Sequence, residues 1–97
     1  MLQRIVKMYF KADEVEGFLS LFESVKGDIR SSDGCHALKL LRDQQNPCIF
    51  FTYSVWEGPE YLERYRHSEL FGKVWKSTKS RFAHRAEAWS VDLLHEL

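Results

Sequence analysis

Apolar residues along the chain recur with two different periods, which divide it into strands and helices. Residues 5–10 and residues 48–56 are short, β-prone apolar runs that predict strands. Between them, apolar positions within residues 15–30 recur at spacings of three, four and seven, which predicts an amphipathic helix. Residues 35–42 alternate imperfectly between apolar and polar side chains and predict a further strand.

The second half of the chain predicts two helices and a last strand. Pro59 suits the first turn of a short helix that reaches about Arg66, and Ser68 can cap a longer helix after it. We expect the apolar face of this longer helix to extend to Phe82. The last strand is expected over about residues 86–94.

The order of these elements predicts the fold class. The five-residue connection 43–47 is short enough to make the second and third strands an antiparallel hairpin. Strand, helix, strand, strand, helices, strand is the order of the ferredoxin-like split β-α-β unit, an α+β fold with a four-stranded antiparallel sheet and its helices on one face. With 97 residues and no linker, we expect a single domain over residues 1–97.

The third predicted strand is apolar on both of its faces. Phe50 and Trp56 fall on one side, whereas Phe51, Tyr53 and Val55 fall on the other. Helices from the same chain can cover only one of these faces. We therefore expect a homodimer that packs sheet against sheet and forms a dimeric α+β barrel.

Composition narrows the range of partners. The 14 basic and 14 acidic residues cancel and are interspersed, so nucleic acid is not an expected partner. No apolar run approaches the roughly 20 residues that cross a bilayer, and the N-terminus lacks the features of a signal peptide, so we expect a cytoplasmic protein with no membrane partner. Cys35 and Cys48 should lie about 20 Å apart on paired strands and stay reduced. The spacings typical of metal sites, phosphate loops and serine elbows are missing.

Three short motifs carry a resemblance to a known family. They are Val55-Trp56-Glu57 at the end of the third strand, Glu60-Tyr61-Leu62, and the segment 67–71, His-Ser-Glu-Leu-Phe. The arrangement resembles the antibiotic biosynthesis monooxygenase family of dimeric α+β barrels over nearly the whole chain. That resemblance implies one of three roles: a cofactor-independent oxygenase acting on phenols and quinols, a haem-degrading enzyme, or a protein without established activity.

The haem-degrading branch of that family can be compared residue by residue. The resemblance places a tryptophan and, about ten residues later, an iron-ligating histidine where this chain has Tyr65 and Trp75. The indole nitrogen of Trp75 is only a donor and cannot ligate iron. The asparagine of the branch's first strand is also missing, with Lys7 and Met8 nearby. We therefore expect no cofactor and no metal.

A cofactor-free oxygenase relies on the electrons of its substrate, because an ionised phenol or quinol can pass one electron to dioxygen. The protein then needs an aromatic pocket, a base and hydrogen-bond donors to the anion. With an ordinary pKa near 6.5, His67 is the predicted catalytic base. The predicted substrate-binding residues are Tyr53, Tyr65, Trp75, His36, Trp56 and Phe22, with Phe50 and Phe71 as further pocket residues.

Each of these assignments has a structural alternative. His67 precedes a helix cap and can be a surface residue or cap partner, and aromatic side chains at these spacings can serve packing alone. The basic residues around Arg66 can be a solvated face or an anion-steering rim. The protein is accordingly predicted to be a monooxygenase for a small aromatic or quinol substrate. The alternatives are a non-catalytic dimeric module that binds a small ligand or regulates, and an isomerase or lyase.

Overall fold

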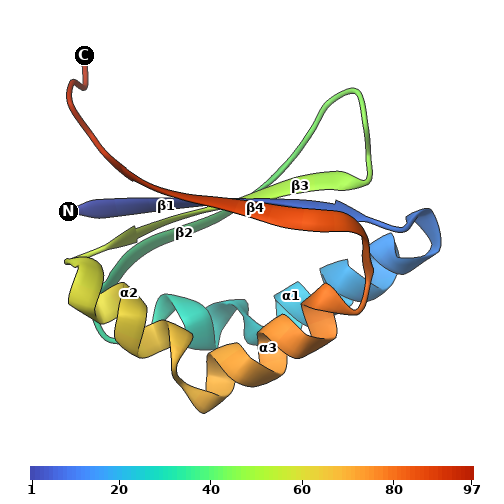
Figure 1. Ribbon diagram of the computed structural model, residues 1–97, viewed down its shortest axis with the longest axis horizontal. Coiled ribbons are helices and arrows are strands. Elements are labelled where there is room, and N and C mark those ends of the chain that lie inside the picture. Colours follow the sequence, from blue (N-terminus) through green and yellow to red (C-terminus); the bar gives the residue numbers. More distant parts are fainter.

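The computed structural model describes all residues from 1 to 97 as a four-stranded sheet with helices against one face (Figure 1). The elements are β1 (Leu2–Phe10), a 3-10 turn η1 (Ala12–Glu14), α1 (Val15–Arg30), β2 (Cys35–Arg42), β3 (Ile49–Trp56), α2 (Pro59–Arg66), α3 (Glu69–Lys79) and β4 (Phe82–Asp92). The strand order is β2-β3-β1-β4, and all neighbouring strands are antiparallel. This confirms the predicted α+β, ferredoxin-like fold class.

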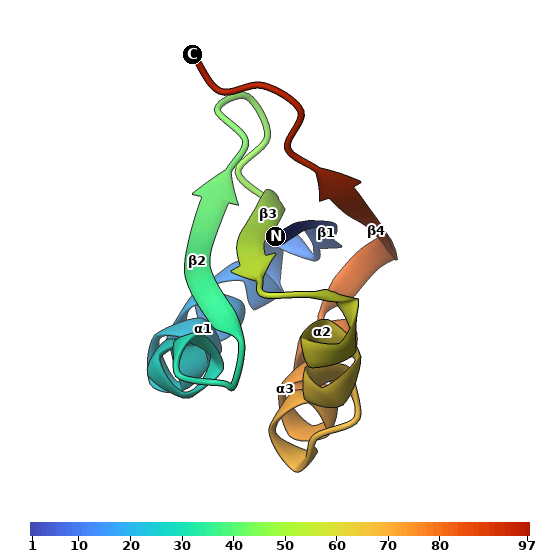
Figure 2. The same cartoon turned by 90° about the vertical axis from the view of Figure 1, so that its left-hand side faces the viewer.

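The helices stand in two groups beneath the sheet. Viewed from the end, α1 lies on one side, and α2 and α3 lie on the other (Figure 2). Contacts between α1 and β2, and between α3 and β4, hold the two groups against opposite edges of the sheet. The central strands β3 and β1 therefore cover the space between the two groups of helices.

Two clusters of buried side chains make up the core. The first joins the end of β1 to the start of α1 and β3, and its members are Met8, Phe10, Val15, Phe18 and Phe50. The second joins the start of β2, the end of β3 and α2 through Cys35, Trp56 and Leu62. Only 12 of the 97 residues are buried, which is a small core for a chain of this length.

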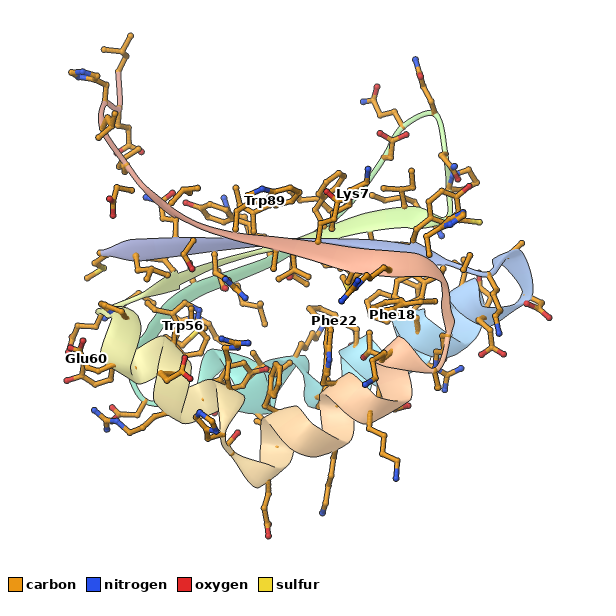
Figure 3. All side chains as sticks on the ribbon, in the orientation of Figure 1. Lys7, Phe18, Phe22, Trp56, Glu60 and Trp89 are labelled. Atoms are coloured by element: carbon orange, nitrogen blue, oxygen red, sulfur yellow. The ribbon has the colours of Figure 1, made fainter.

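The other face of the sheet has no helix over it. Lys7 and Trp89 lie on this outer face, whereas Phe22 and Trp56 lie between the sheet and the helices (Figure 3). The register of β1 with β4 places Trp89 beside Ile5, and Trp89 is 44% exposed. Other large apolar side chains of β2 and β4 are exposed as well, Leu41 and Val91. The outer face therefore leaves apolar surface uncovered in one protomer.

Several strand and helix ends differ from the sequence-based predictions. β1 begins at Leu2 and not at Ile5, because it is a central strand whose ladders with β3 and β4 both extend to Leu2. Phe82 starts β4 and does not belong to the helix. β4 ends at Asp92, the partner of Leu2, so the apolar residues after it have no strand to pair with.

Two further observations bear on the sequence analysis. Cys35 and Cys48 are both free. None of the helices combines the length and apolar character that a membrane-crossing segment needs.

The turn between α1 and β2 contains Gly34, whose φ of +80° is the single positive value in the chain. The Tyr61 ring lies against this glycine.

Candidate functional site

A cavity of about 290 Å³ lies between the sheet and the two groups of helices. This volume is near the lower end of the range for small-molecule pockets, roughly 300–1,000 Å³. Of its 19 lining residues, 14 are hydrophobic, so the cavity suits an apolar ligand. Met8 and Phe18 line it from the first core cluster, and Trp56 and Leu62 line it from the second. The cavity therefore occupies the space between the two clusters.

One wall of the cavity is a continuous series of aromatic rings. Trp56 stacks on Tyr65 with a centroid distance of 4.9 Å, and Tyr65 meets Phe71 edge to face at 5.3 Å. Phe71 then stacks on Trp75 at 5.9 Å. Phe22 lines the cavity from α1, in the other group of helices. An aromatic ligand entering this space would meet ring faces and edges, contacts that aromatic groups favour.

Local hydrogen bonds hold this wall in place. The Trp56 indole is 1% exposed and donates to Ser54 Oγ at 2.9 Å, so its one donor is already used. At the junction of α2 and α3, Ser68 Oγ donates to the Tyr65 carbonyl at 2.6 Å and accepts from the Phe71 amide at 3.1 Å. The cap of α3 therefore fixes the backbone at both neighbouring rings.

The Tyr65 hydroxyl differs from the other polar groups of the wall. It makes no hydrogen bond within the protein, although the ring lines the cavity. Burial, with a smaller contribution from Cys35, raises the pKa of Tyr65 to about 12. The hydroxyl therefore keeps its proton at physiological pH. It is available as a donor to an oxygen atom of a bound ligand.

Two arginines also line the cavity, Arg4 from β1 and Arg66 from the end of α2. Arg4 Nη1 donates to Ser90 Oγ at 3.0 Å, and Arg66 Nη1 lies 3.5 Å from Glu63 Oε2. Burial lowers the pKa of Arg4, and the positive charge of Arg66 lowers it further, while Glu63 acts in the opposite direction. The ionisable side chains that line the cavity are thus these two arginines and Tyr65.

The structure brings together four of the six predicted substrate-binding residues. Phe22, Trp56, Tyr65 and Trp75 all line the cavity. Phe71 lines it too, whereas Phe50 is enclosed in the first core cluster and is absent from the lining.

Tyr53 and His36 lie elsewhere. Tyr53 belongs to the outer face of the sheet, where its hydroxyl donates to Gln3 Oε1 at 2.6 Å, and it does not line this cavity, so its role in substrate binding stays a prediction. The two-residue period of the strand separates Tyr53 from Trp56. His36 is exposed at the start of β2, with Nε2 3.4 Å from Glu57 Oε1, and is also outside the cavity.

His67, the predicted base, lies at the C-terminal end of α2. Its side chain is 75% exposed, and Nε2 is 2.9 Å from Glu63 Oε1 one helical turn earlier. It does not line the cavity of this protomer. A catalytic role for His67 therefore stays a prediction that the geometry of one protomer does not support.

Arg4 is not among the site residues predicted from the sequence, and Arg66 is predicted only as one of several basic residues that form a solvated face or an anion-steering rim. A signal for Arg4 was present in the strand pattern. Arg4 shares its parity with Met8 and Phe10, both of which face the helices. A charged residue at that parity predicts a polar group in the interior or at a cavity. Arg66 carries no comparable signal, because a basic residue in the last turn of a helix is common on surfaces.

Comparison with known proteins places the chain in a family. No curated protein matches the sequence. A solved antibiotic biosynthesis monooxygenase superposes with a TM-score of 0.91 at 20% identity, covering 98% of this chain and all of that one. A conserved protein from Methanosarcina mazei Go1 gives a TM-score of 0.88 at 18% identity, covering 93% of this chain and 89% of its own. Rv0793 from Mycobacterium tuberculosis gives 0.89 at 14% identity, covering 98% and 96%.

These structural likenesses are at low identity and establish the shared fold. The family assignment comes from the sequence itself, since the model of the antibiotic biosynthesis monooxygenase family matches residues 1–77 of the 97. The matched region runs from β1 to the last turns of α3 and includes the aromatic wall. The chain belongs to the antibiotic biosynthesis monooxygenase family.

Proposed function

We propose that the protein is a cofactor-independent monooxygenase that oxidises a small aromatic or quinol substrate in the cavity between the sheet and the helices. The observation that carries the proposal is the Tyr65 hydroxyl, a donor without a protein acceptor in an aromatic-walled cavity. A substrate oxygen bound in the cavity would accept the hydrogen bond that this hydroxyl does not make within the protein. Family membership and the cavity size are consistent with this reaction class.

In the proposed reaction the substrate supplies the electrons. The substrate binds as the anion that forms when a ring hydroxyl gives its proton to solvent, and this anion passes one electron to dioxygen before the two radicals combine at a ring carbon, where the peroxide takes a proton back. The peroxide then breaks its O–O bond, which leaves one oxygen atom on the ring as a carbonyl and releases the other as water. A phenol and dioxygen thus give a quinone and water, with atoms and electrons in balance. The apolar lining keeps bulk water from the intermediates.

The role of the protein is to stabilise the anion and align it. Tyr65 donates to the ionised oxygen, and the positive charges of Arg4 and Arg66 favour ionisation in a partly desolvated site. Trp56, Phe71 and Trp75 confine the ring. His67 would be the base only if it reaches a substrate from its present exposed position.

We also propose that the working unit is a homodimer formed through the outer face of the sheet. The exposed Trp89 and the apolar residues around it support this arrangement, and so does the small number of buried residues. Packing of two such sheets would complete a barrel of the kind that the family resemblance implies.

Oxygen consumption by chelator-treated protein with a panel of dihydroxynaphthalenes tests the activity. Ala86 lines the cavity from β4, so Ala86→Phe fills it without removing a chemical group, and uptake should fall at least tenfold. Ala12→Phe, at an exposed position of η1, is the matched control and should retain uptake. Equal rates in both variants, or no uptake above the protein-free rate, would contradict the proposal.

His67→Ala belongs in the same experiment. A loss of tenfold or more would establish the predicted base, whereas unchanged uptake would remove His67 from the mechanism. The mechanism above, in which Tyr65 and the two arginines stabilise the anion, predicts the second result.

The second candidate function is a non-catalytic module that binds a small aromatic ligand. It is favoured by one observation, the exposed position of His67 away from the cavity. The same observation weighs against an isomerase or lyase, which would need a proton-transfer group beside the substrate. Ligand binding without oxygen uptake would select the binding module.

A further inference from the structure

Arg4 and Arg66 place more positive charge at the cavity than the protein neutralises. Arg4 is half-buried, and its one hydrogen bond goes to the neutral hydroxyl of Ser90. Arg66 reaches one oxygen of Glu63 at 3.5 Å, which is long for a charge-assisted hydrogen bond. The other oxygen of Glu63 is occupied by His67 at 2.9 Å. Glu63 thus pairs with both Arg66 and His67, and Arg4 has no carboxylate in contact with it.

This arrangement leaves the positive charge at the cavity only partly compensated. The two guanidinium groups repel each other, as the lowered pKa of Arg4 reflects after the larger effect of burial. Arg81, by contrast, pairs with the carboxylate of Glu14 at 2.7 Å. An excess of like charge at an apolar cavity indicates a place for a negatively charged ligand group.

We propose that the cavity selects an aromatic ligand that carries a carboxylate, with the carboxylate held by Arg4 and Arg66 and the ring held by the aromatic wall. The inference rests on the proposed function for the location of the site and specifies its substrate class. The planar fork of a guanidinium matches the two oxygens of a carboxylate. With Glu63 as the single nearby counter-charge, one positive charge remains, which one carboxylate would neutralise.

Charge and ring contacts come from different elements of the fold. Arg4 lies on β1, with Ser54 and Ser90 as its cross-strand neighbours, whereas Arg66 ends α2. Tyr65, next to Arg66 in the chain, contributes both a ring and a hydroxyl to the cavity. A ligand with a carboxylate beside a ring hydroxyl would therefore engage the arginines and Tyr65 at the same time.

Binding of two naphthalene probes of nearly equal shape tests the proposal without any reaction. 2-Naphthoate is charged, and 2-naphthamide is its neutral counterpart. Isothermal titration calorimetry should show that the wild-type protein binds 2-naphthoate at least tenfold more tightly than 2-naphthamide. Arg4→Gln and Arg66→Gln should each weaken 2-naphthoate binding at least fivefold and leave 2-naphthamide within twofold.

Arg64→Gln is the matched control. Arg64 lies on the same helix as Arg66 but is 63% exposed, stacks on Tyr61 and pairs with Asp33. This variant should retain the full preference for 2-naphthoate. Arg66→Gln changes an exposed residue and can be expected to fold, so the proposal stays testable if Arg4→Gln does not.

Equal affinity of the wild-type protein for the two probes would overturn the proposal, and so would an equal loss in Arg64→Gln. A third probe, 1-naphthol titrated above its own pKa, separates a carboxylate site from one for an ionised hydroxyl. Tighter binding of the naphtholate than of 2-naphthoate would also overturn the proposal. A preference for 2-naphthoate without any oxygen uptake would refute the monooxygenase and leave this inference standing. Uptake of oxygen with neutral quinols, together with equal affinity for the two probes, would support the monooxygenase and refute the carboxylate site.

Discussion

The hydroxyl of Tyr65 can be removed by Tyr65→Phe, and the structure predicts separate effects on stability and on catalysis. Because no protein atom accepts a hydrogen bond from this hydroxyl, its loss leaves no orphaned partner. The ring contacts with Trp56 and Phe71 persist in phenylalanine. At pH 7 the free energy of unfolding should therefore change by less than about 0.5 kcal/mol.

The catalytic effect should be much larger. A hydrogen bond to a charged group contributes roughly 1.5–3 kcal/mol, so losing it in the transition state should lower kcat/KM for a dihydroxynaphthalene about 10- to 150-fold. The assay is oxygen uptake on the same protein samples that are unfolded in urea. A drop in stability of more than about 1 kcal/mol, or an unchanged kcat/KM, would refute the reasoning.

The raised pKa gives an independent signature at high pH. In the folded protein the pKa of Tyr65 is raised to about 12, against 10.0 for an ordinary tyrosine. The folded state therefore holds its proton where the unfolded state has lost it, and the contribution to stability is present below pH 10 and lost as the pH rises toward 12. At pH 11 the wild type should have lost about 1.4 kcal/mol relative to Tyr65→Phe.

Tyr53→Phe is the matched control for these measurements. The Tyr53 hydroxyl donates to Gln3 Oε1 at 2.6 Å on the outer face. Its removal should lower the free energy of unfolding by about 1 kcal/mol because the Gln3 oxygen loses its donor. The kcat/KM should stay within about twofold of the wild type, since the hydroxyl lies outside the cavity.

Two further predictions concern the fold and the assembly. Gly34→Ala should lower the free energy of unfolding in urea by about 1–3 kcal/mol, because φ is +80° and an added Cβ would lie 2.5 Å from the Tyr61 ring. Gly27→Ala should instead raise the free energy of unfolding by about 0.5–1 kcal/mol, because no atom lies within 4 Å of the added Cβ. A Gly34→Ala variant as stable as Gly27→Ala would contradict this account. Phe51→Lys on the outer face should give monomers or insoluble chains by light scattering, whereas Glu23→Lys on the exposed side of α1 should not. A soluble dimer of Phe51→Lys would count against the proposed interface.

Much of the secondary structure could be predicted because the spacing of apolar residues agrees with the turn and capping residues that bound each element. The strand at residues 35–42 and the helix at residues 59–66 have the predicted bounds, the latter with Pro59 in its first turn. Phe82 shows where periodicity fails. Its ring packs edge to face on Trp75 at 5.7 Å, so it continues the apolar face of α3 although the helix ends three residues earlier, at Lys79. A helical spacing cannot distinguish these two cases.

The site was less predictable than the fold, for a physical reason. Local aromatic segments such as Tyr65 to Trp75 reveal one wall, because neighbouring turns of helix bring their rings together. Arg4 and Arg66 lie more than sixty positions apart, and only the antiparallel pairing of β1 and the placement of α2 bring them to one cavity. The position of His67 depended on the rotation of the last turn of α2, which a sequence period does not fix to within one residue.

The set of ionisable groups around the cavity has a consequence for how the protein could diversify. Two guanidinium groups stay charged and Tyr65 stays neutral across the physiological range, so the protonation state of the walls is constant. The pKa of the substrate's own ring hydroxyl then determines the pH at which the substrate becomes reactive. One scaffold of this kind can serve ring systems of quite different acidity, and its optimum will follow the compound offered to it.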